Sequence, residues 1–250
     1  MNLRRHALTG LLLVAGLELA PAKAWAWTPA TELSIAQEGA RFAPADLHRQ
    51  IARRKRAFTR GIESRGGWAP GERLDDAVVR EVARAVRMLR TPEPFDQVVE
   101  QLGVVCRLVA VAHDPLVASD ADREESRYAA DYARYAEGAS ARFPLVFYGF
   151  RRDFDEPQDV ARLVAEAVAR GRSLYPAVGR EYRRIRFGRG TALFDDRSTA
   201  FGVTSLAWSH AASDVGEVLR YIWLQAGGAD DRRRLPSRGG RLLRIPRAPR

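Results

Sequence analysis

Few histidines and carboxylates in this chain are placed where they could do chemistry. Beyond residue 26 there are three histidines, His48, His113 and His210. His210 and Asp214 stand four residues apart in a stretch with helical periodicity, so their side chains would share one helix face. The same face carries apolar residues, which predicts that the pair points inward: Val203, Ala207, Val218 and Tyr221. An inward His and Asp must bond each other, bond other polar groups or bind a metal, and the sequence leaves these alternatives open.

The other residues of reactive types stand in less suggestive places. His113 directly precedes Asp114 and Pro115, at the end of a long apolar run. A histidine at the C-terminal end of a helix is usually a partner of the helix dipole or a surface residue. His48 stands among basic residues and is predicted to face solvent. Cys106 lies inside the apolar run, where a small core side chain is expected rather than a nucleophile.

Several reaction classes lack their sequence signatures here. The chain has no G-x-S-x-G motif, no P-loop, no G-x-G-x-x-G motif and no pair of cysteines. With a single cysteine, no internal disulfide can hold an exported domain together. The sequence therefore assigns no catalytic residue.

Hydrophobic periodicity predicts an all-α fold built as a multi-helix bundle. Apolar residues recur at helical spacing, and no stretch of any length alternates with the period of a strand. The nearly continuous apolar run from 98 to 112 ends before Pro115 and is typical of a buried central helix. Tyr128, Tyr132 and Tyr135 would share one helix face. The predicted helices span 31–41 (capped by Thr31), 45–60, a segment around 78–89, 98–112, part of 120–140, 157–170, 172–186 (bent at Pro176) and 198–225.

The first 26 residues have the pattern of a secretory signal peptide. Arg4 and Arg5 precede an apolar core at 11–17, which is shorter than a bilayer span. Small residues give two overlapping cleavage motifs, which end at Ala24 and Ala26. The alternative is an uncleaved N-terminal anchor. No later run is apolar enough to form a second span, so we expect an exported protein, periplasmic or secreted, with one domain over residues 27–228.

The positive charge is concentrated at the C-terminal end. The net charge is +10, and the tail, residues 229–250, contains eight arginines against Asp230 and Asp231. Such a composition is typical of a disordered, solvated terminus. A tail of this kind is also able to contact nucleic acid, anionic lipid or another anionic polymer.

The residues after the cleavage motifs resemble the start of a known family. The run from Trp27 through Glu32 to Ile35 and Ala36 is similar to the mature N-terminus of the zinc-dependent phospholipase C and S1/P1 nuclease superfamily. Members of that superfamily are exported and all-α, and they begin at a tryptophan whose amino group and carbonyl bind zinc. The resemblance implies that Trp27 and Glu32 are metal ligands, with glutamate at a position where the family has histidine.

Two later segments resemble the same superfamily. Residues 102–116 are similar to its buried ligand helix, and residues 194–223 are similar to its last ligand helix, which carries His-x-x-x-Asp or His-x-x-x-Glu. The second match implies that His210 and Asp214 are metal ligands. In the first match, three ligand positions of the family hold residues that cannot bind zinc: Arg107, Val111 and Val117.

These replacements predict that the trinuclear zinc site of the family has been lost. Such a site uses several His and Asp ligands to hold metals that polarise a phosphoryl oxygen and generate hydroxide. Arg107 would place a cation in the pocket and oppose zinc binding by repulsion. It could instead pair with Asp214 or Glu32. We therefore expect a degenerate member of the superfamily.

Three functions remain as hypotheses. The first is a non-catalytic binding or envelope protein that keeps the helical fold. The second is a metal-dependent hydrolase of phosphoric esters with one zinc, held by some of Trp27, Glu32, His210 and Asp214. The third is a polyanion-binding protein that acts through its arginine-rich tail. The expected partners are phosphate esters or anionic polymers.

Overall fold

The computed structural model describes residues 27–117, 123–229 and 241–244. The predicted signal peptide lies outside the described residues. Within them the chain is an all-α, multi-helix bundle with one two-stranded sheet, and the predicted fold class is confirmed. The helices are α1 (Pro29–Ala40), α2 (Ala45–Arg53), α3 (Lys55–Glu63), α4 (Leu74–Arg90), α5 (Phe95–Ala112), α6 (Ala129–Ala139), α7 (Pro157–Arg184), α8 (Gly190–Leu193) and α9 (Thr199–Gln225), and the strands are β1 (Leu145–Phe147) and β2 (Arg241–Arg244).

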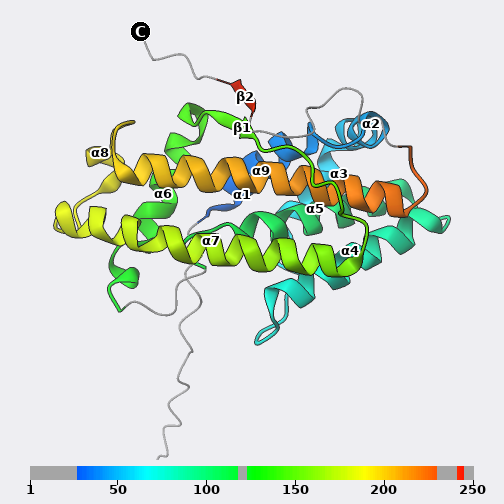
Figure 1. Ribbon diagram of the computed structural model, residues 1–250, viewed down its shortest axis with the longest axis horizontal. Helices are drawn as coiled ribbons and strands as arrows, with labels where there is room; N and C mark the ends of the chain where they lie inside the picture. Colours follow the sequence, from blue (N-terminus) through cyan, green and yellow to red (C-terminus); the bar gives the residue numbers. More distant parts are fainter. Residues whose placement is uncertain (1–26, 118–122, 230–240, 245–250) are drawn as a thin grey trace, which may run out of the picture.

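Helix α9 is the axis of the bundle. Helices α7 and α9 lie side by side and run in opposite directions, while α1 and α5 pack on other sides of α9 (Figure 1). Helix α5 is buried on nearly all sides, and Leu102, Val105 and Leu108 have no exposed surface. The prediction of a buried central helix is therefore confirmed. Cys106 is buried in it, and this burial raises the pKa of the thiol far above its ordinary value.

Two glycines allow α3 and α5 to approach backbone to backbone. A Cβ atom at Gly61 would lie 2.9 Å from the Cα of Gly103, and a Cβ at Gly103 would lie 3.0 Å from the Cα of Gly61. Real Cβ atoms do not tolerate such distances to backbone atoms without a shift. The small size of both residues therefore sets how closely the two helices pack.

The predicted helix over 45–60 is divided into two. The chain leaves helical geometry at Arg54, where φ is −115° and ψ is 37°, and α3 begins at the next residue. Helix α3 packs along α5, whereas α2 lies at the periphery (Figure 1). The close contact between Gly61 and Gly103 sets the direction of α3, and the chain turns at Arg54 to reach it.

The first helix begins two residues earlier than predicted. Its N-cap is Thr28 rather than Thr31, and the hydroxyl oxygen of Thr28 accepts a hydrogen bond from the N–H of Thr31 at 3.2 Å. Pro29 occupies the first helical position, where a missing N–H costs nothing. Ser198 caps α9 as predicted, and its hydroxyl oxygen accepts a hydrogen bond from the N–H of Phe201 at 3.2 Å.

Helix α7 continues through the predicted boundary at Gly171 and joins the two helices predicted over 157–170 and 172–186. It is one helix of 28 residues, with Pro176 in its interior on the exposed side, where water can reach the backbone. Tertiary packing stabilises the second half, since Tyr182 is buried and its ring stacks on Tyr128 at 4.6 Å between centroids. Among the described residues, neither α7 nor any other helix is both long and apolar enough to cross a membrane.

The sheet was not predicted. Strands β1 and β2 pair antiparallel, so residues 241–244 of the tail, predicted to be disordered, form a strand. The other side of β1 is held by α9, because hydroxyls of Ser209 and Ser213 accept hydrogen bonds from the N–H groups of Val146 and Tyr148 at 3.3 and 3.2 Å. The ion pair of Arg244 with Glu38, at 3.1 Å, holds β2 against α1. The rest of the tail, 230–240 and 245–250, lies outside the described residues.

Candidate functional site

The structure distributes the residues expected to bind metal over two clusters. The His–Asp cluster consists of His113, His210 and Asp214. The Glu32 cluster consists of Glu32, Arg65 and Arg107. Trp27 is buried and belongs to neither cluster. Its backbone N–H donates a hydrogen bond to Oδ2 of Asp114 at 3.1 Å.

In the His–Asp cluster, the partner of Asp214 is His113. The two atoms closest to each other, His113 Nε2 and Asp214 Oδ2, are 3.0 Å apart. His113 caps the C-terminal end of α5 and is buried, so of the two expected roles, dipole partner or surface residue, the surface residue is wrong. Burial alone would raise the pKa of Asp214, but His113, Arg151 and Arg170 lower it below its ordinary value. The carboxylate is therefore ionised at neutral pH.

His210 shares the helix face of Asp214 but makes a different contact. Its ring stacks on that of Tyr148, with 3.9 Å between centroids and 5° between planes, and lies parallel to the ring of His113 at 6.5 Å. Burial, together with the nearby Arg170 and His113, lowers the pKa of His210 to about 4. His210 is consequently neutral at neutral pH, and the predicted inward orientation is accounted for by an aromatic stack.

The backbone N–H of Trp27 is bound by Asp114, which the sequence did not single out as a site residue. Its Oδ2 accepts from the N–H of Trp27, and its Oδ1 accepts from the N–H of Leu116 at 2.9 Å. Trp27 and Asp114 are both almost completely buried. The position of Asp114 before Pro115, at the end of an apolar helix, was the signal available for it.

In the Glu32 cluster, a buried carboxylate forms an ion pair with one arginine and lies within the influence of a second arginine's charge. Glu32 on α1 is completely buried, and its Oε2 lies 3.3 Å from Nη1 of Arg65. Arg107 on α5 is also completely buried, and its guanidinium donates to the carbonyl oxygen of Gly66. Burial raises the pKa of Glu32 to about 7, although Arg65 and Arg107 both act to lower it. Arg107 was expected to pair with either Asp214 or Glu32. Of these two carboxylates, Glu32 is the one whose pKa the charge of Arg107 lowers.

The raised pKa of Glu32 predicts a pH-dependent stability. Below its ordinary pKa of 4.5, Glu32 is protonated in both the folded and the unfolded chain. Its contribution to the free energy of unfolding is then at its maximum. As the pH rises from 4.5 to about 7, the unfolded chain loses this proton while the folded chain still holds it. Ionisation therefore favours the unfolded chain, and the free energy of unfolding falls. Relative to Glu32→Gln, the wild type should lose about 2 to 3 kcal/mol between pH 4.5 and 8, measured by urea unfolding at each pH.

The exposed Glu93→Gln variant controls for the removal of one negative charge. It should follow the wild-type pH profile. Equal pH profiles for Glu32→Gln and the wild type would contradict the raised pKa.

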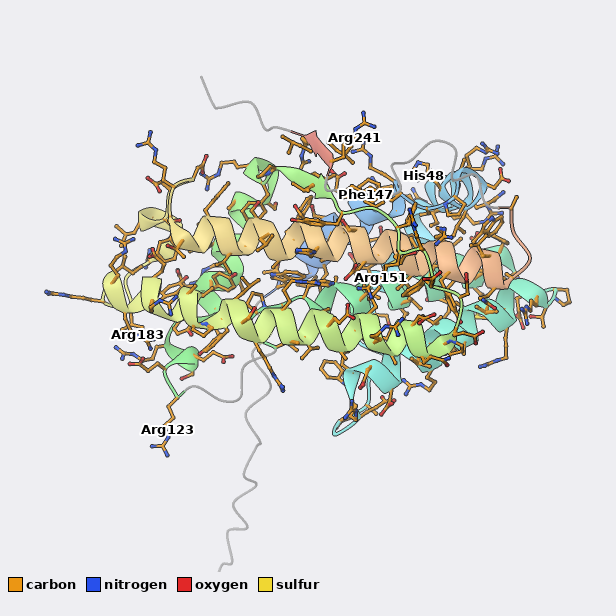
Figure 2. The ribbon with its side chains drawn as sticks, viewed as in Figure 1. His48, Arg123, Phe147, Arg151, Arg183 and Arg241 are labelled. Atoms are coloured by element: carbon orange, nitrogen blue, oxygen red, sulfur yellow. The ribbon has the colours of Figure 1, made fainter. Side chains whose placement is uncertain are left out.

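The other two residues that the resemblance places at ligand positions belong to the core. Val111 is buried on α5, and Val117 is half-buried and packs against the core. His48, labelled in Figure 2, was expected to face solvent but is half-buried. Its Nδ1 lies 2.9 Å from the carbonyl oxygen of Ala40. None of these three residues adds a metal ligand to the His–Asp cluster or to the Glu32 cluster.

The side chains present do not fit a metal centre as they are arranged. Across residues 27–117, 123–229 and 241–244, no three His, Cys, Asp or Glu side chains gather closely enough to hold an ion. Glu32 is engaged by Arg65, Asp214 by His113 and the Trp27 N–H by Asp114. Two guanidinium groups beside Glu32 would also repel a divalent cation.

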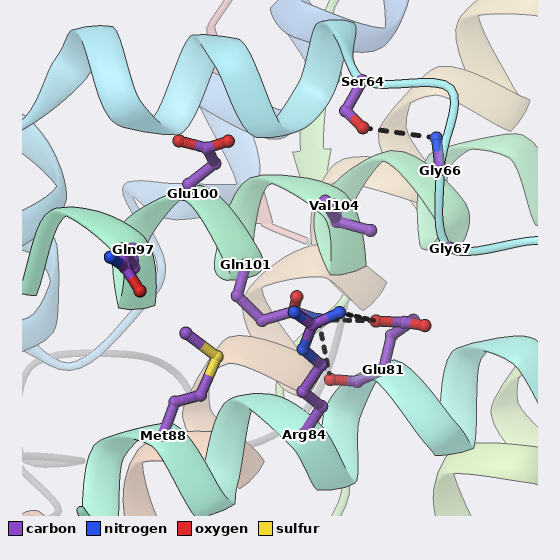
Figure 3. A pocket seen from close by; sticks show the side chains of 10 residues that line it. All are labelled: Ser64, Gly66, Gly67, Glu81, Arg84, Met88, Gln97, Glu100, Gln101 and Val104. Atoms are coloured by element: carbon purple, nitrogen blue, oxygen red, sulfur yellow. Dashed lines mark hydrogen bonds and ion pairs between the residues drawn. The ribbon is translucent and has the colours of Figure 1, made fainter. Parts of the chain in front are cut away.

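A cavity adjoins the Glu32 cluster through Gly66. It has a volume of about 340 Å³ and lies between the loop at 64–67, α4 and α5 (Figure 3). Figure 3 shows Gln101 and Arg84 directed at the carboxylate of Glu81, and Gln101 Nε2 donates to Glu81 Oε2 at 2.9 Å. Glu81 lies between Val78, Val82 and Ala85 on the apolar face of α4, and this break in the pattern was the signal available for it.

No family model, curated protein or solved structure matches this chain. The resemblance to the phospholipase C and nuclease superfamily therefore depends on the sequence motifs at 27–36, 102–116 and 194–223.

Proposed function

We propose that this chain is an exported, non-catalytic binding protein, related to the zinc-dependent phospholipase C and S1/P1 nuclease superfamily, that has lost the trinuclear zinc site. The proposal takes the cavity beside the Glu32 cluster as the ligand site. Support comes from the motif resemblance, from the replaced ligand positions and from the contacts that the surviving candidate ligands make within the protein.

The observation that carries the proposal is the environment of Arg107. This residue stands at a position where the family pattern requires a metal ligand, and its side chain is completely buried beside Glu32. A buried guanidinium is a fixed positive charge, since arginine does not lose its proton in proteins. This fixed charge, together with the ion pair that Arg65 makes with Glu32, supplies positive charge where the family pattern would place a metal.

The cavity supplies groups for a small polar ligand. Its lining includes the carboxylates of Glu81 and Glu100, the guanidinium of Arg84 and the amides of Gln97 and Gln101. Carboxylates and amides together accept several hydrogen bonds, and a guanidinium donates them in a fork. The ligand class favoured by this lining is a small molecule rich in hydroxyl or amino groups.

Zinc content and phosphodiester hydrolysis are measured on the exported protein, purified without chelators. We expect well below one zinc per chain by elemental analysis, no hydrolysis of bis(p-nitrophenyl) phosphate above a boiled control, and the same result for His210→Ala. About one zinc per chain, lost in His210→Ala together with hydrolysis, would instead establish the one-zinc hydrolase.

The binding site is tested on the same preparation by thermal shift with a panel of sugars, amino sugars and amino acids. Val104→Phe fills the cavity, while Val79→Phe makes the same change on α4 outside it. A compound that raises the Tm of the wild type and of Val79→Phe, and leaves Val104→Phe unchanged, supports the site. A shift that persists in Val104→Phe would place binding elsewhere.

A further inference from the structure

The junction between α2 and α3 gathers positive charge in one groove. Arg53, Arg54, Lys55 and Arg56 follow one another in the sequence, and all four line the groove together with Arg60. In an unbroken helix, four consecutive side chains would point around the whole circumference. The break at Arg54 changes the direction of the chain between them, so that they face the same groove of about 850 Å³.

Much of this charge is not neutralised within the protein. Arg54 lies 3.0 Å from Asp96, and Arg60 lies 3.0 Å from Glu100. Arg53, Lys55 and Arg56 are exposed and have no carboxylate partner in the part of the chain that the structure describes. Three cations held this close repel one another, and an anion that binds between them removes that repulsion.

We propose that this α2–α3 groove is a binding site for a compact ligand that carries two or more phosphate groups. Arginine offers planar, forked donors that match phosphate oxygens, and lysine adds a flexible point charge. Three uncompensated cations match a ligand with several negative charges better than one with a single charge. The proposal does not depend on the proposed function, because the groove at the α2–α3 junction shares no lining residue with the cavity beside the Glu32 cluster.

A nucleic acid fits the groove less well. Among the described residues that line it, none is aromatic, so bases have no ring on which to stack. Glu63 and Asp96 also lie in the lining and interrupt a continuous positive track along a polymer backbone. The chemistry therefore favours clustered phosphates over an extended strand.

The test uses inorganic tripolyphosphate and isothermal titration calorimetry on the full exported chain. The groove variant combines Arg53→Gln, Lys55→Gln and Arg56→Gln. A control variant removes equal charge at exposed arginines that have no ion-pair partner among the described residues: Arg152→Gln, Arg180→Gln and Arg197→Gln. We expect the groove variant to bind at least about tenfold more weakly than the wild type, and the control variant to bind within about twofold.

Binding that weakens equally in both triple variants would overturn the proposal, because net charge alone would then explain it. Absence of tripolyphosphate binding by the wild type, together with absence of binding to vesicles that contain cardiolipin, would overturn it as well. Groove-dependent binding to cardiolipin vesicles identifies a lipid as the source of the phosphates, whereas groove-dependent binding to tripolyphosphate alone identifies a soluble ligand. Duplex DNA that binds more tightly than either, with the same dependence on the groove, would replace the proposal by a nucleic-acid site. Circular dichroism spectra that match the wild type confirm that both variants fold.

Discussion

Replacing Gly61 with alanine should lower the free energy of unfolding by about 3 kcal/mol. The added Cβ would lie 1.9 Å from the carbonyl oxygen of Glu100 and 2.9 Å from its carbonyl carbon. Both are backbone atoms of α5, so no side-chain rotation can relieve the clash and the two helices must move apart. Urea unfolding, followed by the circular dichroism of the helices, would measure the loss.

The matched control is Gly138→Ala in α6, where a new Cβ meets no atom within 4 Å. That variant should be as stable as the wild type or gain about 0.5 to 1 kcal/mol from the higher helix propensity of alanine. Gly103→Ala should lose stability like Gly61→Ala, because its Cβ would lie 2.3 Å from the carbonyl oxygen of Phe58. If Gly61→Ala were as stable as Gly138→Ala, the close packing of α3 on α5 would be wrong.

The second large effect is expected at a buried ion pair on α9. Arg220 Nη1 lies 3.0 Å from Glu217 Oε1, and each side chain is only 2% exposed. Glu217 Oε2 also accepts a hydrogen bond from the backbone N–H of Arg151 at 2.6 Å. Burial raises the pKa of Glu217, while the Arg151 N–H and Arg220 oppose this rise. Arg220→Met would leave a buried carboxylate without its counter-charge and should cost about 3 to 5 kcal/mol.

Two variants separate the loss of charge compensation from the loss of side-chain volume. In the double variant Glu217→Gln with Arg220→Met, the glutamine oxygen can still accept from Arg151 and no charge is left buried, so at least about half of the loss should be recovered. Arg49→Met removes the arginine of an exposed pair with Asp46 and should cost less than about 0.5 kcal/mol. A double variant as unstable as Arg220→Met would show that packing by the arginine stem, rather than its charge, stabilises α9. Urea unfolding of the four proteins at one pH provides the comparison.

Local signals were sufficient for most of the helices. The apolar run from 98 to 112 predicted a buried helix, and Ser198 predicted the start of the longest C-terminal one, because both signals act within a few residues. Boundaries failed where packing opposed the local signal. Gly171 predicts a helix end, yet α7 continues past it, since Tyr182 and its neighbours are buried against the Tyr128 region.

The sequence was unable to predict the sheet for a different reason. Strands of three and four residues are too short to show a period of two, and their pairing joins residues almost one hundred positions apart. The serines that hold β1 from the other side look, in the sequence, like small residues on a helix face.

The same limit applies to the candidate site. Residue type and helical spacing alone were enough to predict the helical fold class, the shared helix face of His210 and Asp214, and the presence of Arg107 in a buried helix. The partners of these residues follow from the packing of the helices: Asp214 faces His113, Glu32 faces Arg65, and the Trp27 N–H donates to Asp114. These partners lie 33 to 101 residues apart along the chain, and the way in which helices pack, rather than the pattern within any one helix, brings them together.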